Sequence, residues 1–179
     1  MRPPVPRPEP AMTWSTRPET PADVAAVHAL NAAAFPTPAE ADLVDALRAD
    51  PGAWLDGLSY VSCDADGRPT GYALLTRCHI GGTPALCLAP CAVRPDRQRE
   101  GAGSAAIRAV LTAAAARGEK HVVVLGHASY YPRFGFTRAS AHGIRLGIDV
   151  PDDSLMALSL DPAVPLPAGT VRYAAAFGI

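Results

Sequence analysis

The chain has little charge and no excess of either sign. Charged residues make up 18% of its 179 residues, and 16 Lys and Arg against 17 Asp and Glu leave a formal net charge of -1. Binding to nucleic acid relies on a basic surface that neutralises phosphates, so this balance predicts no nucleic-acid partner. The basic residues that do cluster, Arg94, Arg97 and Arg99, therefore suit a small anion better than a long one.

The sequence also lacks an apolar run of the roughly 20 residues that span a bilayer, and we expect no membrane partner. Its first residues contain no apolar segment of the kind found in a secretory signal. They are rich in proline, which favours an extended chain. We therefore expect a disordered tail over residues 1–12, with Met12 as an alternative start, and a single domain over residues 13–179. We also expect the protein to be cytoplasmic.

Cysteines are few, and none is spaced for a shared metal or redox function. Cys63, Cys78, Cys87 and Cys91 form no C-x-x-C pair, and all four lie in strand-like runs. Such cysteines are typical of small buried side chains in a reducing compartment. The sequence predicts neither disulfides nor a metal site.

The most informative segment present is a glycine turn between a predicted strand, residues 85–93, and a predicted helix, residues 104–117. Gly101 and Gly103 allow close approach of the backbone to a ligand, and the first amides of a helix attract anions. The turn therefore predicts a seat for a phosphate or pyrophosphate.

The remaining pattern predicts an α/β fold. Residues 121–125 are continuously apolar and β-branched, as in a strand buried on both faces, and they follow a helix, so they complete a βαβ unit with residues 85–93. Further elements are expected as follows: strands over 14–17, 58–63, 71–80, 144–148 and 155–160, and helices beginning at Thr20 and Thr37.

Two motifs at a fixed distance carry a family resemblance: Val93, Pro95, Gln98, Gly101 and Gly103, and then Tyr131, Gly135 and Phe136. Together they resemble the GCN5-related N-acetyltransferase (GNAT) superfamily. The segment Tyr130–Phe136 resembles its YhbS-like branch of predicted acetyltransferases. The resemblance implies a mixed, mostly antiparallel sheet with flanking helices, in which one parallel pair of strands splays apart.

The resemblance also implies where acetyl-CoA binds. Pantetheine is expected along the backbone of Cys91, Ala92 and Val93, and the pyrophosphate on the turn that contains Arg99, Glu100, Gly101, Ala102, Gly103 and Ser104. The expected reaction transfers an acetyl group from acetyl-CoA to a primary amine of a small molecule or peptide. No metal is required for this transfer.

For the catalytic groups, the family motif places Tyr131 beside the sulfur of CoA, where its phenol can protonate the leaving thiolate. His127 follows the buried strand and is our candidate base. His79 is a weaker candidate, Glu40 and Asp42 are alternatives for holding a cationic amine, and a chain of waters would make a dedicated base unnecessary.

Two other functions stay open at this point. One is an acyl-CoA-binding regulatory module without turnover, and the other is an acyltransferase that uses a carrier other than CoA. The oligomeric state is also open, and a homodimer is one option.

Overall fold

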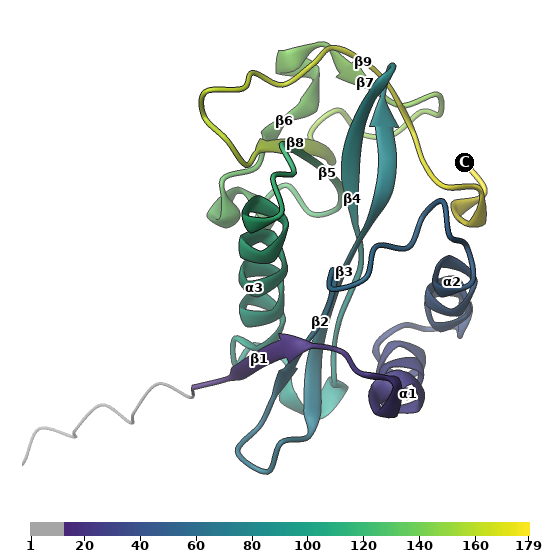
Figure 1. Ribbon diagram of the computed structural model, residues 1–179, viewed down its shortest axis with the longest axis vertical. Coiled ribbons are helices and arrows are strands. Elements are labelled where there is room, and N and C mark those ends of the chain that lie inside the picture. Colours follow the sequence, from purple (N-terminus) through teal and green to yellow (C-terminus); the bar gives the residue numbers. More distant parts are fainter. Residues whose placement is uncertain (1–12) are drawn as a thin grey trace, which may run out of the picture.

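Two long antiparallel strands, β3 (Pro69–Ile80) and β4 (Thr83–Val93), run through the middle of the computed structural model (Figure 1). The structure describes residues 13–179, and the predicted disordered tail lies outside the described residues. The sheet order is β1-β2-β3-β4-β5-β8-β6, and β9 pairs with β3 and with β7. The other strands are β1 (Ser15–Pro18), β2 (Ser59–Cys63), β5 (His121–Leu125), β6 (Thr137–Arg138), β7 (Ile144–Arg145), β8 (Leu155–Ser159) and β9 (Gly169–Arg172).

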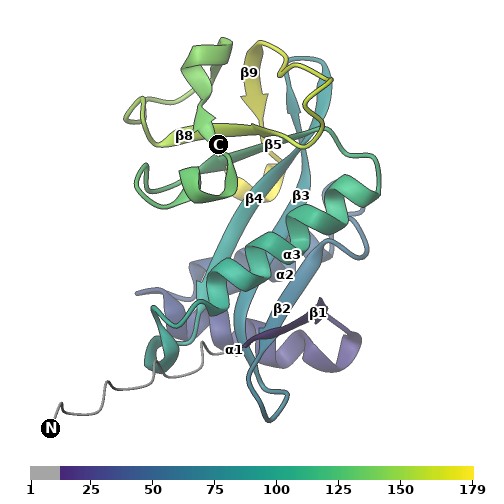
Figure 2. The same ribbon diagram turned by 90° about the vertical axis from the view of Figure 1, so that its left-hand side faces the viewer.

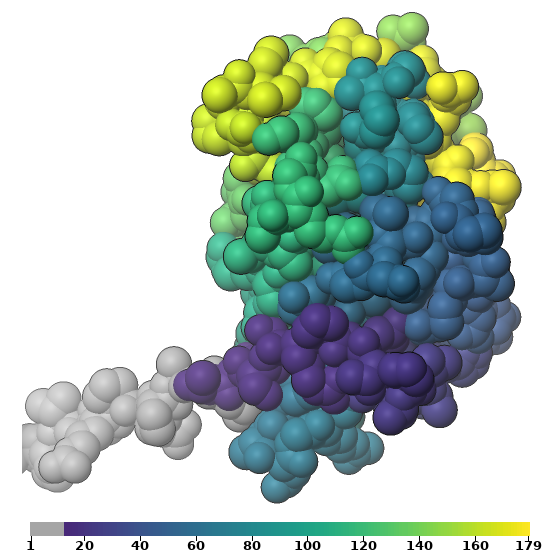
Figure 3. All heavy atoms as spheres, viewed as in Figure 1, coloured from purple at the N-terminus to yellow at the C-terminus, as the bar shows by residue number. Residues whose placement is uncertain are grey.

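Helices cover both faces of the sheet (Figures 1 and 2). On one face lie α1 (Val24–Ala34) and α2 (Ala39–Arg48), whose buried Val27, Leu30, Val44 and Leu47 pack with side chains of β2, β3 and β4. The other face carries α3 (Ala102–Ala116), whose buried stripe includes Ala106, Ile107, Val110 and Ala114. In the space-filling view, β1 (purple) crosses the lower part of the molecule below α3 (Figure 3). The apolar stripes, spaced at helical intervals, thus decide which side of each helix faces the sheet.

The parallel pair is short. β4 and β5 pair only at Leu86 with Val122 and at Cys87 with Val123, although β4 continues to Val93 (Figure 2). Beyond Cys87, β4 stays with β3, whereas β5 continues in antiparallel pairing with β8. The predicted mixed, mostly antiparallel sheet with a splayed parallel pair and flanking helices is therefore confirmed.

Several predicted boundaries were wrong. The strand expected over residues 144–148 ends at Arg145, because β7 pairs only through Ile144 and Arg145 and the chain turns outward at the exposed Gly147. The helix expected from Ser104 begins two residues earlier, at Ala102, because Gly101 at its N-cap already redirects the chain. The short strands β6 and β9 were not predicted. No helix among residues 13–179 is long and apolar enough to cross a membrane.

Candidate functional site

The second half of β4 has an unpaired edge. Cys91, Ala92 and Val93 pair with Ala73, Tyr72 and Gly71 of β3, but on their other side no strand of residues 13–179 takes up their backbone. Between Leu88 and Cys91 the two residues Ala89 and Pro90 lie opposite the single residue Leu74, which is a β-bulge. Backbone donors and acceptors here are available to an extended ligand.

The chain leaves β4 through a tight turn and enters α3. Gly101 has φ +91° and Arg99 has φ +64°, so the backbone reverses sharply twice within three residues. The first helical bond runs from the Ala105 N–H to the Gly101 carbonyl. The N–H groups of Ala102, Gly103 and Ser104 precede it, and the first amides of a helix have no partner in the helix's own ladder of hydrogen bonds. Three amides at the positive end of a helix dipole are an arrangement that attracts anions.

Neighbouring groups hold this turn in place. The Trp14 Nε1–H donates to the Glu100 carbonyl over 2.8 Å, and the Ser62 hydroxyl donates to the Ala102 carbonyl over 2.7 Å. Gly103 is buried against β4, where an added Cβ would lie 2.8 Å from Val93 Cγ2. The turn is therefore fixed from three sides before any ligand arrives.

The arginines of the turn are mostly engaged within it. Arg94 pairs with Asp96 at 2.7 Å. Arg97 pairs with Glu100 at 2.6 Å and lies over the Trp14 ring. Arg99 is exposed. Arg94 and Arg97 thus shape the turn through internal ion pairs, and Arg99 extends toward solvent.

Tyr131 begins the 3-10 turn η3 (Tyr131–Phe134) and lies against the open part of β4. Its side chain and that of Cys91 pack against the same buried apolar cluster. Burial raises the pKa of Tyr131 well above its usual value, and the neighbouring Cys91 acts in the same direction. Burial also raises the pKa of Cys91 to about 12, against a smaller lowering by Tyr131. Both groups therefore stay protonated at neutral pH, and the phenol can act as a proton donor.

Gly126 makes room for the Tyr131 ring. An added Cβ at Gly126 would lie 2.4 Å from Tyr131 Cε2. The Phe136 ring packs against Tyr131 edge-on, with centroids 6.0 Å apart. The Tyr131 ring therefore sits in a slot made by the chain on both sides of it.

The structure places the His127 side chain in an exposed position. The residue lines a pocket of about 280 Å³ together with Leu125, Gly126, Val150, Pro151 and Ser154. Its carbonyl accepts the N–H of Tyr130 at 3.1 Å and of Tyr131 at 3.5 Å. His127 thus holds the tyrosine segment through its backbone, and neither Tyr131 nor Cys91 is among the residues that line its pocket.

Comparison with known proteins agrees with this geometry. The model of the acetyltransferase (GNAT) family matches residues 24–136. The chain belongs to this family. It is 33% identical over 131 residues to the uncharacterized N-acetyltransferase YhbS of Escherichia coli K12, a match that covers 72% of this chain and 77% of that protein. It is 37% identical over 118 residues to the uncharacterized N-acetyltransferase YjhQ of the same strain, covering 64% of each chain.

Two solved structures of GNAT proteins resemble the whole fold. The E. coli YhbS structure in complex with CoA superimposes with a TM-score of 0.86 at 28% identity, covering 97% of this chain and 96% of that one. A Brucella melitensis GNAT acetyltransferase in complex with acetyl-CoA gives a TM-score of 0.75 at 31% identity, covering 93% and 99%. The fold is thus one that holds CoA in related proteins.

The other predicted polar residues of this GNAT chain lie apart from the Tyr131 region. His79 stands at the far end of β3, opposite Pro84 and Arg172. Glu40 is half-buried at the start of α2, and one of its carboxylate oxygens is buried without a partner within residues 13–179. Asp42 is exposed in the same first turn of α2.

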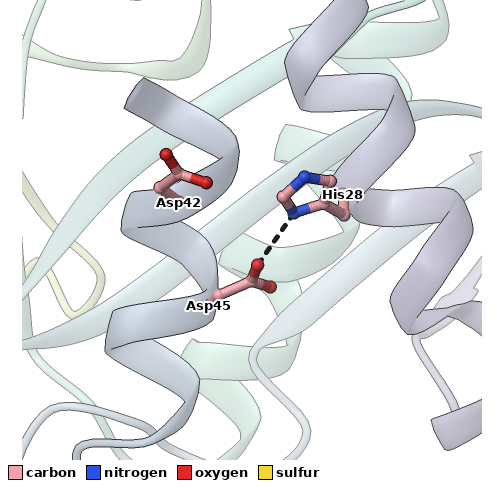
Figure 4. Close-up of side chains that lie close together, drawn as sticks. All are labelled: His28, Asp42 and Asp45. Carbon is pink, nitrogen blue, oxygen red and sulfur yellow. Dashed lines mark hydrogen bonds and ion pairs between the residues drawn. The ribbon is translucent and has the colours of Figure 1, made fainter. Parts of the chain in front are cut away.

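Asp42 belongs to a cluster with His28 and Asp45, whose ligand-type atoms lie within 4.8 Å of one another (Figure 4). His28 Nδ1 and Asp45 Oδ2 are 2.8 Å apart, so this pair links α1 to α2. All three side chains are accessible to solvent, and the helix-to-helix link accounts for their arrangement. The expectation that the protein needs no metal stays an expectation.

Sequence reasoning missed three features of the site. The bulge at Ala89 and Pro90 was signalled by a proline inside a strand pattern, which is typical of a bulge or an edge. The contact of Trp14 with Glu100 joins residues 86 positions apart, and no local pattern indicates it. The third feature is a hydrogen bond of 3.0 Å between the hydroxyls of Ser104 and Tyr130.

Proposed function

We propose that this GNAT protein transfers an acetyl group from acetyl-CoA to a primary amine. The observation that carries the proposal is the unpaired half of β4, which has an amide turn at one end and the protonated phenol of Tyr131 beside it. The names of the relatives and the CoA and acetyl-CoA in the two similar structures support it.

The residues present fit a CoA thioester. In the proposal, the backbone of Cys91, Ala92 and Val93 pairs with pantetheine as a further strand would. The pyrophosphate accepts hydrogen bonds from the amides of the turn from Arg99 to Ser104, with Glu100, Gly101, Ala102 and Gly103 between them. The close packing of Gly103 on Val93 is a cradle that a side chain would fill. When bound, acetyl-CoA supplies an activated acyl group on sulfur.

Tyr131 is proposed as the general acid, which donates its phenolic proton to the departing sulfur. Unpaired N–H groups near the bulge of β4 are the donors available to the acyl oxygen as negative charge develops on it. His127 is the proposed base for the amine, because its exposed imidazole lies at the end of β5. The pocket of about 280 Å³ that His127 lines is the proposed place of the amine.

The setting is also part of the proposal. We place the protein in the cytoplasm, supported by its four free cysteines, which suit a reducing compartment. Its substrate partners are acyl-CoA and a small-molecule or peptide amine. We expect no nucleic-acid or membrane partner, and a homodimer remains one option.

The test combines binding with turnover. CoA should raise the melting temperature of the wild type progressively with concentration, because it binds the folded state. Acetyl-CoA with a panel of primary amines should then release free thiol. Stabilisation by CoA without thiol release from any amine would favour the silent acyl-CoA-binding module. Turnover of another acyl carrier without stabilisation by CoA would favour the non-CoA acyltransferase. If CoA does not stabilise the protein and no acyl donor is turned over, the proposed function and both alternatives are overturned.

A further inference from the structure

Tyr130, next to the proposed acid, bridges the two sides of the splayed strands. It lies after β5, yet its hydroxyl is 3.0 Å from the hydroxyl of Ser104 in the first turn of α3. A Cβ added to Gly103 would lie 3.8 Å from the same Tyr130 hydroxyl. The side chain therefore reaches from the tyrosine segment to the amide turn.

The ring of Tyr130 is held firmly and contacts Tyr131. Its centroid is 5.1 Å from that of Tyr131, with the rings at 83°, and 5.4 Å from that of Phe134. The Arg133 guanidinium lies 4.2 Å over the ring, and its Nε–H donates to the Tyr130 carbonyl over 2.8 Å. Gly126 also lies close against the Tyr131 ring, so Tyr130 and Gly126 both limit the positions that the phenol can take.

The Ser104 hydroxyl can bond to Tyr130 and to a bound anion at the same time. A serine hydroxyl donates one hydrogen bond and accepts others. If the Tyr130 O–H donates to Ser104 Oγ, the Ser104 O–H is left to donate to an anion on the neighbouring amides. Such a bond to a charged oxygen is stronger than one between neutral groups.

We propose that Tyr130 is a positioning residue that couples the amide turn to Tyr131. A diphosphate group on the turn orders the Ser104 hydroxyl, Ser104 orders Tyr130, and the Tyr130 ring fixes the phenol of Tyr131. This inference rests on the proposed function. It means that the diphosphate of CoA, far from the thioester, helps to align Tyr131, the proposed acid at the sulfur.

The test uses Tyr130→Phe, Ser104→Ala and the double variant, with two acyl donors. S-acetylpantetheine presents the same thioester as acetyl-CoA but has no diphosphate. With acetyl-CoA, each single variant should lower kcat by about two- to tenfold, the range expected for one hydrogen bond between neutral groups. The double variant should lose no more than either single one, because both remove the same link. With S-acetylpantetheine, wild type and Tyr130→Phe should turn over at equal rates.

Binding gives a readout that does not depend on turnover. By calorimetry, Tyr130→Phe should weaken the binding of CoA and leave the affinity for pantetheine unchanged, because only CoA carries the diphosphate that engages Ser104. Tyr60→Phe and Thr112→Ala are matched controls, on β2 and on the exposed side of α3. Both should behave as wild type.

Other results would overturn the coupling. Equal losses with both donors would show that Tyr130 only packs against Tyr131. Additive losses in the double variant would show that Ser104 and Tyr130 act separately, and unchanged kinetics would remove both from the mechanism. If wild type binds no CoA, the proposed function itself fails, which the first titration reveals before any variant is compared.

Discussion

The two halves of β4 share one strand but have opposite surroundings. In the paired half, Leu86 and Cys87 lie between β3 and β5, with both backbone edges paired and both side chains buried. Residues 88–93, the open half, keep β3 on one edge only and contain the bulge. The pairing with β5 therefore ends at Cys87, and the open half begins at the next residue.

This difference shows how one strand serves as scaffold and as site. In the paired half, the backbone N–H and C=O groups have partners on both sides, so burying this part of the strand leaves few polar groups unsatisfied. The paired half therefore fixes the position of the strand. In the open half, unpaired amides and carbonyls remain near the surface, where a ligand can complete the ladder. Variants in the two halves and in their neighbours should therefore separate stability from function.

The largest effect should come from Tyr131→Phe, which keeps the ring beside the open half and removes its proton donor. We expect kcat to fall by about 10²- to 10⁴-fold, the usual contribution of general acid catalysis, with CoA affinity nearly unchanged. Because burial holds the pKa of Tyr131 above its usual value, the phenol stays protonated up to at least about pH 10. The ratio of wild-type to variant rates should thus be constant from about pH 6 to about pH 10. Equal rates would instead make Tyr131 a packing residue.

Leu86→Ala should affect the paired half alone. Leu86 is fully buried in the cluster under α3, and its truncation leaves a cavity. We expect the free energy of unfolding to fall by about 2–5 kcal/mol in a urea titration. The affinity of the remaining folded protein for CoA should match that of wild type. A large loss of affinity at low temperature, where the variant is folded, would contradict the separation of the two halves.

Gly103→Val should damage the turn beside the open half. The new side chain collides with Val93 and displaces amides that we expect to bind the pyrophosphate. Losing one such charge-assisted bond costs about 1.5–3 kcal/mol, or about 10- to 100-fold in CoA affinity by calorimetry. Gly82→Ala is a suitable control, because nothing lies within 4 Å of its added Cβ. Unaltered affinity in Gly103→Val would place the pyrophosphate elsewhere.

Asp23→Asn should give the smallest effect, far from either half. Hydrogen bonds from Arg17 lower the pKa of Asp23 in the folded protein, and bonds from Thr20 add to this against its burial. A lowered folded pKa gives stabilisation that is present above the unfolded value of about 4 and is lost as the pH falls through the folded value. We expect a loss of about 1–2 kcal/mol at pH 7 that shrinks near pH 3, measured by urea unfolding. Asp66→Asn, in an exposed turn, is the control and should leave the free energy of unfolding unchanged at both pH 7 and pH 3.

The sequence was most informative where local chemistry decides the structure. The glycine turn, the apolar stripe of α3 and the β-branched strand β5 each predicted their element, since backbone freedom and helical spacing can be read over a few residues. Contacts between distant segments were not predictable in this way. The bond from Trp14 to Glu100 and the one from Ser104 to Tyr130 depend on tertiary packing, and the short strands β6 and β9 form only because β8 and β3 offer them an edge.

The contact of Trp14 with the turn also gives the protein an optical reporter. The chain has two tryptophans, Trp14 against Glu100 and Arg97, and Trp54 beneath Arg48 on the opposite helical layer. Indole emission depends on nearby charge and on hydrogen bonding at Nε1. In a Trp54→Phe background, fluorescence would report on Trp14 alone, so that events at the turn could be followed in real time without a label.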